Sequence, residues 1–240
     1  MAGQLLLGHA RNLLAQAERL RAEFQGRREL EGGRAAFGVI PTIAPYLLPQ
    51  ILGPFRKAHP GIIVAIDESR TAQLIPKVAS GEVEFAVVSD VAAADLRKRS
   101  LHLREVFREP LLLATHRSHP LALRKQPPGP EDIDAAEMIQ LNGGHCLAER
   151  NLKIWHACKQ DFHLQCDQIA TALAMVSSGM GVTIVPQLAA GKVPEDVVCR
   201  PFSGKGLERP INLLKRRAAK LTPPAEKLLA AFSECSAVWA

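Results

Sequence analysis

One short stretch of the chain holds the residue types of a reactive thiol site. In "LNGGHCLAERN", Gly143 and Gly144 are followed by His145 and then by Cys146. A cysteine reacts as its thiolate, so groups near the sulfur must favour negative charge. The stretch therefore indicates a thiol that attacks an oxidant or an electrophile. The alternative is that Cys146 only packs in the core, as free cysteines commonly do.

Several neighbours of Cys146 favour the thiolate. A helix that begins near Leu147 places the cysteine at a helix N-terminus, where unpaired amides and the helix dipole stabilise an anion. His145 can donate a hydrogen bond, and Arg150 follows one turn later on the same face. Glu149 opposes them, but the balance predicts a lowered pKa for the Cys146 thiol. The preceding glycines let a small ligand approach the backbone closely.

The remaining cysteines do not indicate a metal site or a disulfide framework. The chain has five cysteines, an odd number, at irregular spacing and without a C-x-x-C pair. Zinc sites and structural disulfides show such pairs or an even set, so no metal and no cofactor are expected. Cys199 and Cys235 have apolar neighbours and are expected to be packing residues.

The composition indicates a globular chain. Its 240 residues are 47% hydrophobic, enough for one large domain or two small ones. The formal net charge is +6, but the basic residues are spread along the chain without aromatic partners, which disfavours direct nucleic-acid binding by these residues. With no signal peptide and no apolar run of roughly 18 to 20 residues, a cytoplasmic protein without membrane contact is expected. In that reducing compartment a disulfide would be transient and regulatory.

The elements that must position these residues form two α/β series. In the first, β-branched runs predict strands at 35–41, 62–67 and 84–89, with helices at 45–58 and 71–80 between them. Such a series predicts parallel strands that are buried on both faces and joined by right-handed crossovers.

The second series and a tail complete the chain. The patterns predict strands at 109–115, 137–141, 162–166 and 181–186, helices from about 147 and over 167–178, and a tail with strands at 197–202 and 209–216 and a helix from 222 to about 238. The tail is too short to be a third domain, so the pattern predicts two doubly wound lobes. The expected divisions are lobe I over 34–88, lobe II over 89–198, and completion of lobe I by 199–240.

The first segment has the pattern of a dimerising helix. Apolar residues recur at alternating steps of four and three, at Leu6, Ala10, Leu13, Ala17, Leu20 and Phe24. This spacing is the a/d seam of a coiled coil, and it predicts a helix over 1–26 that pairs two copies of the chain. The alternative is an amphipathic helix that folds onto its own domain.

Ligands in doubly wound sheets bind beyond the carboxyl ends of the strands. That rule selects Thr42, residues 69–71, Ser89 and residues 143–146. It therefore predicts that Cys146 faces a cleft between the lobes, where ligand sites are common.

At these residues the chain resembles a known family. The run "GRAAFGVIPTIAPYLLPQILGPFRKAHPGIIVAIDESRTAQLIPKVASGEVEFAVVS" resembles the first half of the effector-binding domain of LysR-type transcriptional regulators, and "MVSSGMGVTIVPQLA" resembles a signature of its second lobe. The opening "LLLGHARNLLAQAERL" resembles the linker helix of that family. The resemblance covers nearly the whole chain.

The resemblance implies a fold and a role. The fold is a pair of Rossmann-like lobes of the type 2 periplasmic-binding-protein kind after a dimerising linker helix. The role is that of a regulator, not an enzyme, which assembles as a dimer or a tetramer through the linker helix and the lobes. DNA would be bound only through an N-terminal winged helix-turn-helix, which is absent from this chain, so we expect the chain to be the regulatory part of a longer protein.

Within that family, "GGHCL" is similar to the "GHCL" of OxyR-type hydrogen-peroxide sensors. The resemblance implies that Cys146 is oxidised by peroxide to switch transcription. It implies that His145, Thr42 and Thr71 polarise or hold the peroxide and its water, near the amides of Gly143 and Gly144. Glu149 replaces the usual aspartate three residues after the cysteine.

The resemblance departs from the family pattern at the resolving cysteine. Nine residues after Cys146, where such sensors carry a second cysteine, this chain has Trp155. Cys158 and Cys166 are the remaining candidates. In one continuous helix Cys146 and Cys158 would lie ~18 Å apart, against a Cα separation of roughly 7 Å that a disulfide allows. A bridge therefore requires this segment to unwind, and otherwise Cys146 would report through its sulfenic acid alone.

Other functions stay open from the sequence. A LysR-type regulator that binds a small, often anionic metabolite would use Thr42, Thr71, Arg70 and the glycine amides, with Cys146 a bystander. A cysteine-dependent enzyme would need a positioned base, and no histidine spacing identifies one. A secreted solute-binding protein shares the two-lobed plan, but the missing signal sequence and the linker helix argue against it.

Overall fold

The computed structural model describes residues 32–142, 163–204 and 207–234, and five positions of the first segment: Ala10, Leu13, Leu14, Gln16 and Ala17. Those five positions are helical, and their side chains are exposed. The rest of the expected dimerising helix over 1–26 lies outside the described residues, so its pairing stays a prediction. The chain divides into two compact units, Met1–Phe107 with Pro210–Ala240 as unit 1, and Arg108–Arg209 as unit 2.

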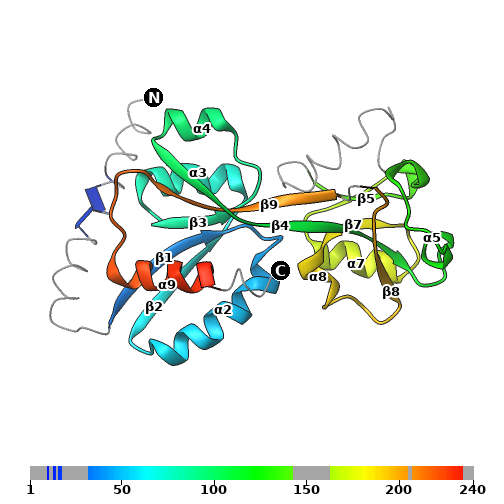
Figure 1. The fold of residues 1–240 in the computed structure, drawn as a ribbon, viewed down its shortest axis with the longest axis horizontal. Coiled ribbons are helices and arrows are strands. Elements are labelled where there is room, and N and C mark those ends of the chain that lie inside the picture. Colours follow the sequence, from blue (N-terminus) through cyan, green and yellow to red (C-terminus); the bar gives the residue numbers. More distant parts are fainter. Residues whose placement is uncertain are drawn as a thin grey trace. The chain divides into compact units, whose positions relative to one another are not determined.

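Unit 1 is built on the first α/β series (Figure 1). Its elements follow the chain in the order β1 (Gly33–Val39), α2 (Ala44–Ala58), β2 (Ile62–Glu68), α3 (Thr71–Ser80) and β3 (Phe85–Val88). Strand β1 lies between β2 and β3 and pairs with both in parallel. The predicted βαβαβ series is therefore confirmed, with element ends within a few residues of those expected.

Local sequence explains where the two helices begin and end. Pro45 lies in the first turn of α2, where a missing N–H is tolerated, and Leu47, Ile51 and Phe55 are buried at steps of one turn. Helix α3 ends at Gly81, whose φ of 82° is left-handed and whose N–H donates to carbonyls of the last turn. Glycine takes that conformation at little cost, so it stops the helix at this point.

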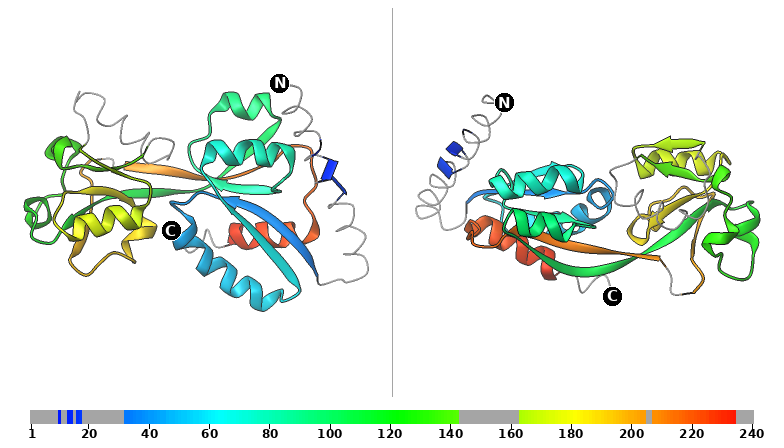
Figure 2. Two further views of the ribbon diagram at one scale, coloured as in Figure 1. Left: turned by 180° about the vertical axis from the view of Figure 1, so that it is seen from behind. Right: turned by 90° about the horizontal axis from the view of Figure 1, so that it is seen from above.

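Adjacent residues of β1 show that helices cover both faces of this sheet. Phe37 contacts Phe232 of α9 (Pro223–Glu234), with ring centroids 5.2 Å apart, and stacks on Phe85 of β3 at 5.4 Å. The next residue, Gly38, faces α3, because a Cβ there would lie 2.5 Å from Leu74 Cδ2. Successive strand residues point to opposite faces, so α9 and α3 lie on opposite sides of the sheet (Figure 2). This is the doubly wound arrangement that the pattern predicted.

The tail of the chain is joined to unit 1 by a buried carboxylate. Glu84 Oε2 accepts from the N–H of Thr222 at 2.7 Å, and Glu84 Oε1 accepts from the Thr222 hydroxyl at 3.0 Å. Thr222 Oγ1 also accepts from the N–H of Ala225 at 3.4 Å, in the first turn of α9. The same threonine thus caps the last helix and ties it to the residue before β3.

Two long strands belong to both units. Strand β4 (Leu101–His116) and strand β9 (Leu207–Arg216) are neighbours in the sheet order β2-β1-β3-β9-β4-β7. The units divide within these strands, at Phe107/Arg108 and Arg209/Pro210, and not at 88/89 and 198/199 as expected. The expectation missed the first half of β4 because "LHLREVFRE" is mostly polar and has a single β-branched residue, Val106, so it is not a β-branched run. It also missed α4 (Ala93–Lys98).

Unit 2 carries the second series. The second half of β4 pairs in antiparallel with β7 (Thr183–Pro186) and β8 (Val197–Pro201), and β5 (Ile139–Leu141) pairs in parallel with β6 (Leu164–Cys166). The helices of unit 2 in the described part are α5 (Pro120–Leu123), α7 (Ile169–Ser177), α8 (Gln187–Ala190) and two short 3-10 turns, Pro130–Asp132 and Ala135–Glu137. The helix expected from about 147 lies outside the described residues.

A buried ion pair lies in unit 2 where β4 and β9 enter it. Arg209 and Glu109 have side chains 0% and 2% exposed, and the guanidinium donates to Glu109 Oε2 from Nε at 2.8 Å and from Nη2 at 2.7 Å. The second oxygen, Glu109 Oε1, accepts from the N–H of Leu188 in α8 at 2.9 Å. Buried charges need such partners because desolvation is costly.

Candidate functional site

The three parallel strands of unit 1 end at one edge of the sheet, and backbone hydrogen bonds hold the residues there. The N–H of Ile40 donates to Val87 O at 3.2 Å, and the N–H of Ser69 donates to Val39 O at 3.1 Å. Parallel strands bring their carboxyl ends together, so the residues selected from the sequence in this unit, Thr42, Ser69, Thr71 and Ser89, lie along one edge.

Thr71 is the first residue of α3, and its hydroxyl has a defined donor role. Thr71 Oγ1 donates to the carbonyl oxygen of Ser89 at 3.0 Å, which joins the start of α3 to the end of β3. The hydroxyl proton is thereby committed, and the lone pairs of Oγ1 are the groups it offers to a ligand. Just before it, the N–H of Arg70 donates to Gln73 Oε1 at 3.2 Å, which helps to cap the start of α3.

Thr42 and Ser89 are the buried hydroxyls of this edge. Thr42 is 3% exposed in the turn between β1 and α2, and Ser89 is fully buried. The Ser89 hydroxyl donates to Asp90 Oδ2 at 3.0 Å. Asp90 has a φ of 52°, a left-handed conformation that aspartate tolerates better than most residues. The edge is therefore lined by hydroxyl groups with one carboxylate at its end.

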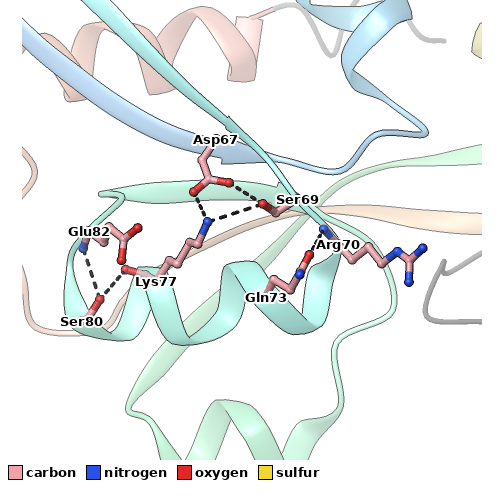
Figure 3. A network of polar contacts seen from close by, with 7 residues as sticks. All are labelled: Asp67, Ser69, Arg70, Gln73, Lys77, Ser80 and Glu82. Carbon is pink, nitrogen blue, oxygen red and sulfur yellow. Dashed lines mark hydrogen bonds and ion pairs between the residues drawn. The ribbon is translucent and has the colours of Figure 1, made fainter. Parts of the chain in front are cut away.

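A polar network that the sequence did not single out supports the end of β2 (Figure 3). Ser69 Oγ donates to Asp67 Oδ1 at 2.5 Å, and the ammonium of Lys77 pairs with Asp67 Oδ2 and lies 3.5 Å from Ser69 Oγ. Partial burial raises the pKa of Asp67, but the hydrogen bonds from Lys77 and Ser69 and the charge of Lys77 outweigh it, so the pKa is lowered. Asp67 is thus an anion that orients Ser69.

A signal for this network is present in the sequence. Asp67 stands at a strand end, and Lys77 follows in the last turn of the next helix, on the side that packs on the strands. A βα unit folds its helix back along its strand, so a pair with this spacing can meet. Among the predicted site residues, neither was included.

The predicted residues around the thiol lie outside the described part of the chain. These are Gly143, Gly144, His145, Cys146, Glu149 and Cys158. The described range before them ends at Asn142, whose N–H donates to Cys166 O at 2.8 Å. The surroundings of Cys146 stay a prediction.

Cys166 is the one candidate resolving cysteine that the structure describes. It ends β6 beside Leu141, is 8% exposed, and its thiol donates to Gln168 O at 3.5 Å. Burial raises the pKa of the Cys166 thiol above its ordinary value, with the charge of Asp167 acting in the same direction. A protonated, buried thiol is a poor nucleophile.

Cys199 has the surroundings of a packing residue. It lies in β8 with its side chain partly exposed, and burial raises the pKa of its thiol to about 11. At neutral pH its thiolate is therefore scarce, in keeping with the expectation from its apolar neighbours.

Comparison with known proteins assigns the fold. Residues 28–236 match the family model described as the LysR substrate binding domain. The chain belongs to this LysR family. That span covers all of unit 2 and most of unit 1. The match and the structural neighbours confirm the predicted fold class of two doubly wound lobes of the type 2 periplasmic-binding-protein kind.

Relatives within the LysR family include peroxide-responsive regulators. The chain is 30% identical over 233 residues to a hydrogen peroxide-inducible genes activator of Dickeya chrysanthemi, covering 95% of this chain and 74% of that protein. It is 30% identical over 237 residues to the DNA-binding transcriptional dual regulator OxyR of Escherichia coli K12, covering 96% of this chain and 75% of that protein.

Solved structures of LysR-family regulatory domains share the fold. The reduced OxyR regulatory domain from Pseudomonas aeruginosa superposes with a TM-score of 0.72 at 24% identity, covering 84% of this chain and 98% of that one. A reduced form of OxyR superposes with a TM-score of 0.69 at 28% identity, covering 86% of this chain and 97% of that one.

Two features were searched for in the residues that the structure describes. In the part of the chain that the structure describes, His, Cys, Asp and Glu side chains form no group of three or more that could hold a metal ion. No helix within the described ranges is long and apolar enough to cross a membrane. The LysR family is a family of transcriptional regulators and not of enzymes.

Proposed function

We propose that this chain is the sensor part of a LysR-type transcriptional regulator in which hydrogen peroxide oxidises Cys146 and thereby switches transcription. The observation that carries the proposal is the match over 95% of the chain to a peroxide-inducible activator, together with the "GHCL" motif at the thiol. The hydroxyl-lined strand edge of unit 1 supports it, because it includes both threonines that the motif comparison selected.

The proposed reaction is a two-electron oxidation of sulfur. The Cys146 thiolate attacks one oxygen of the peroxide, an S–O bond forms, and the O–O bond breaks. The products are the sulfenic acid and a hydroxide, which takes up a proton to become water. Donors near the leaving oxygen lower the barrier, and we assign that role to His145.

Thr42 and Thr71 are proposed to bind peroxide or the water that accompanies it. The Thr71 hydroxyl donates to Ser89 O, so it would accept a hydrogen bond from the peroxide. The amides of Gly143 and Gly144 would donate to the substrate, and Glu149 would accept from it.

The fate of the sulfenic acid depends on which second thiol can reach it. Cys166 lies in register with Leu141, and Leu141 stands five residues before Cys146 in the sequence. Its buried, protonated thiol opposes attack on the sulfenic acid. We therefore propose that Cys158 is the preferred partner if a disulfide forms, and that the sulfenic acid persists if it does not.

The test is the order in which thiols react with peroxide. Reduced chain is treated with low-micromolar hydrogen peroxide, trapped with a sulfenic-acid reagent, and analysed by mass spectrometry alongside Cys146→Ser, Cys158→Ser and Cys166→Ser. Cys146 should be modified first, and Cys158→Ser should abolish any disulfide that Cys166→Ser retains. Modification of Cys146 no faster than that of Cys199, whose pKa is about 11, rejects peroxide sensing.

A second candidate is a regulator that responds to a small anionic metabolite. The same strand edge, with Arg70 before the first turn of α3, suits such a ligand, and Trp155 occupies the place of the usual resolving cysteine. A metabolite that raises the melting temperature of Cys146→Ser, and loses that effect in Thr71→Val, supports this alternative over peroxide sensing.

We also propose that the chain self-associates in the cytoplasm through the helix over 1–26 and its regulatory units, as a dimer or a tetramer. The coiled-coil spacing supports the proposal, and Leu13 is 66% exposed on a single copy. Sedimentation equilibrium of the chain and of Leu13→Lys tests it. A monomeric wild type, or an unchanged assembly in the variant, contradicts a role for this helix.

A further inference from the structure

The fold of unit 1 gathers positive charge from two segments that are far apart in the sequence. The segments "RKRSLHLR" at 97–104 and "KRRAAK" at 215–220 contain four lysine or arginine residues each and no acidic residue. Their eight positive charges exceed the formal net charge of +6 of the whole chain. We call this set the basic patch: Arg97, Lys98, Arg99, Arg104, Lys215, Arg216, Arg217 and Lys220.

The two segments touch. The N–H of Arg217 donates to Ser100 O at 3.0 Å, where α4 leads into β4 and β9 ends. Strands β4 and β9 are neighbours in the sheet, so the end of one lies beside the start of the other (Figures 1 and 2). Six of the eight side chains are exposed, and Lys215 and Arg216 are partly buried.

Little nearby charge opposes the basic patch. Asp95 lies 4.0 Å from Arg99 in a solvent-exposed ion pair, so it offsets one of the eight positive charges. Arg104 donates to Ser233 Oγ at 2.5 Å, and Glu105 follows it in the sequence. Within the described ranges, no side-chain ion pair involves Arg97, Lys98, Arg217 or Lys220.

The composition of the patch selects the kind of partner. Neither segment contains an aromatic residue, so stacking on the bases of a single strand is not provided for. Leu101 is buried and none of the large exposed apolar side chains belongs to these segments, so the apolar anchors of a protein interface are missing. Lysine and arginine side chains alone suit the phosphates of a double helix.

We infer that the basic patch binds the phosphate backbone of duplex DNA without reading its sequence. The inference goes beyond peroxide or metabolite sensing, and beyond the expectation that DNA is bound only through an N-terminal domain. A regulator of the LysR family works on DNA, and a second contact from the sensor part would add affinity that depends on salt and not on base sequence.

The salt dependence of binding follows from the number of phosphates neutralised. With roughly four contacts, the logarithm of the association constant falls with that of salt at a slope of about −3.6. Binding of the 240-residue chain to a fluorescein-labelled duplex of arbitrary sequence should then weaken roughly 150-fold between about 50 and 200 mM salt, as measured by fluorescence anisotropy.

A pair of charge-matched variants tests the location. The patch variant carries Arg97→Gln, Lys98→Gln, Arg217→Gln and Lys220→Gln, and the control carries Arg56→Gln, Lys57→Gln, Lys125→Gln and Lys227→Gln, all at exposed positions. Both lose four charges. The patch variant should lose most of its salt dependence, with a slope reduced by about 0.9 for each contact removed, and the control should keep that of the wild type.

Three outcomes overturn the inference. The first is the absence of salt-dependent binding by the wild type, and the second is equal weakening of the patch variant and the control. The third is binding of poly-L-glutamate that is as tight as that of DNA and depends on the patch, which would assign the surface to an acidic protein. Circular dichroism and melting temperature check that both variants fold. If the patch variant is destabilised, the single variants Arg97→Gln and Lys220→Gln replace it, each with an expected slope change of about 0.9.

Discussion

Glu109 and Arg209 form a fully buried ion pair between residues 100 positions apart in the sequence. Arg209 donates twice to one carboxylate oxygen, and the other oxygen accepts from the backbone of Leu188. The pair therefore ties β4, β9 and α8 together inside unit 2, and each partner is needed to compensate the charge of the other.

Glu109→Ala should strongly destabilise the chain. The substitution leaves the Arg209 guanidinium buried without a counter-charge, at a cost of about 3–5 kcal/mol in the free energy of unfolding. Urea unfolding followed by circular dichroism measures it. The double variant Glu109→Leu with Arg209→Met should recover most of the loss, and a single variant within about 1 kcal/mol of wild type contradicts the pair's role.

Thr222→Ala should loosen the last helix from unit 1. It removes the cap of α9 and the hydroxyl donor to Glu84, at a cost of about 1–2 kcal/mol. Thr222→Ser keeps the hydroxyl and should lose only about 0.8 kcal/mol, for the buried methyl group. Urea unfolding compares the two, and an equal loss in both variants would assign the effect to the methyl group.

Asp67→Asn should reduce stability in a pH-dependent way. The folded pKa of Asp67 is lowered below its ordinary value of 3.8, so the carboxylate stabilises the folded chain fully above that value, and the contribution is lost as the pH falls through the folded pKa. The difference in unfolding free energy between wild type and Asp67→Asn should therefore shrink below pH 3.8. Lys77→Met serves as a control background. In it, Asp67→Asn should cost less free energy of unfolding at neutral pH, because the partner of the carboxylate is already removed. A difference independent of pH contradicts the ion pair.

Cys199 should resist alkylation in the folded chain. A pKa raised from 9.0 to about 11 lowers its thiolate fraction near pH 8 roughly hundredfold relative to the unfolded chain. Iodoacetamide labelling of native and urea-unfolded chain, read by mass spectrometry, measures the ratio. Cys166 should also be protected, and equal labelling rates in the two states would show that burial does not control either thiol.

Thr71→Val should slow the oxidation of Cys146 if the proposed peroxide reaction is correct. The substitution keeps the shape but removes a hydroxyl, and one hydrogen bond to the substrate corresponds to a rate loss of roughly tenfold. Thr71→Ser should retain the wild-type rate. The second-order rate constant of sulfenic-acid formation is the measurement, and an unchanged rate in Thr71→Val removes Thr71 from the site.

The local pattern of the sequence determined most of the elements and the place of the hydroxyl edge. Strands β1, β2 and β3 and helices α2 and α3 follow from β-branched runs and turn residues that lie next to each other in the chain. Thr42 and Thr71 could be selected because each lies in the turn after a predicted strand, and parallel strands necessarily end at the same edge.

The tertiary structure alone decided which distant residues meet. The Glu109–Arg209 pair and the contact between Arg217 and Ser100 both depend on how β4 and β9 align, and the division of the chain within those strands depends on their full length. If the pairing of two strands shifted by one residue, every side chain of the shifted strand would turn to the other face of the sheet. No local pattern specifies the alignment of strands so far apart in the sequence. For that reason the basic residues are spread along the sequence, and only the folded unit 1 brings them together as one patch.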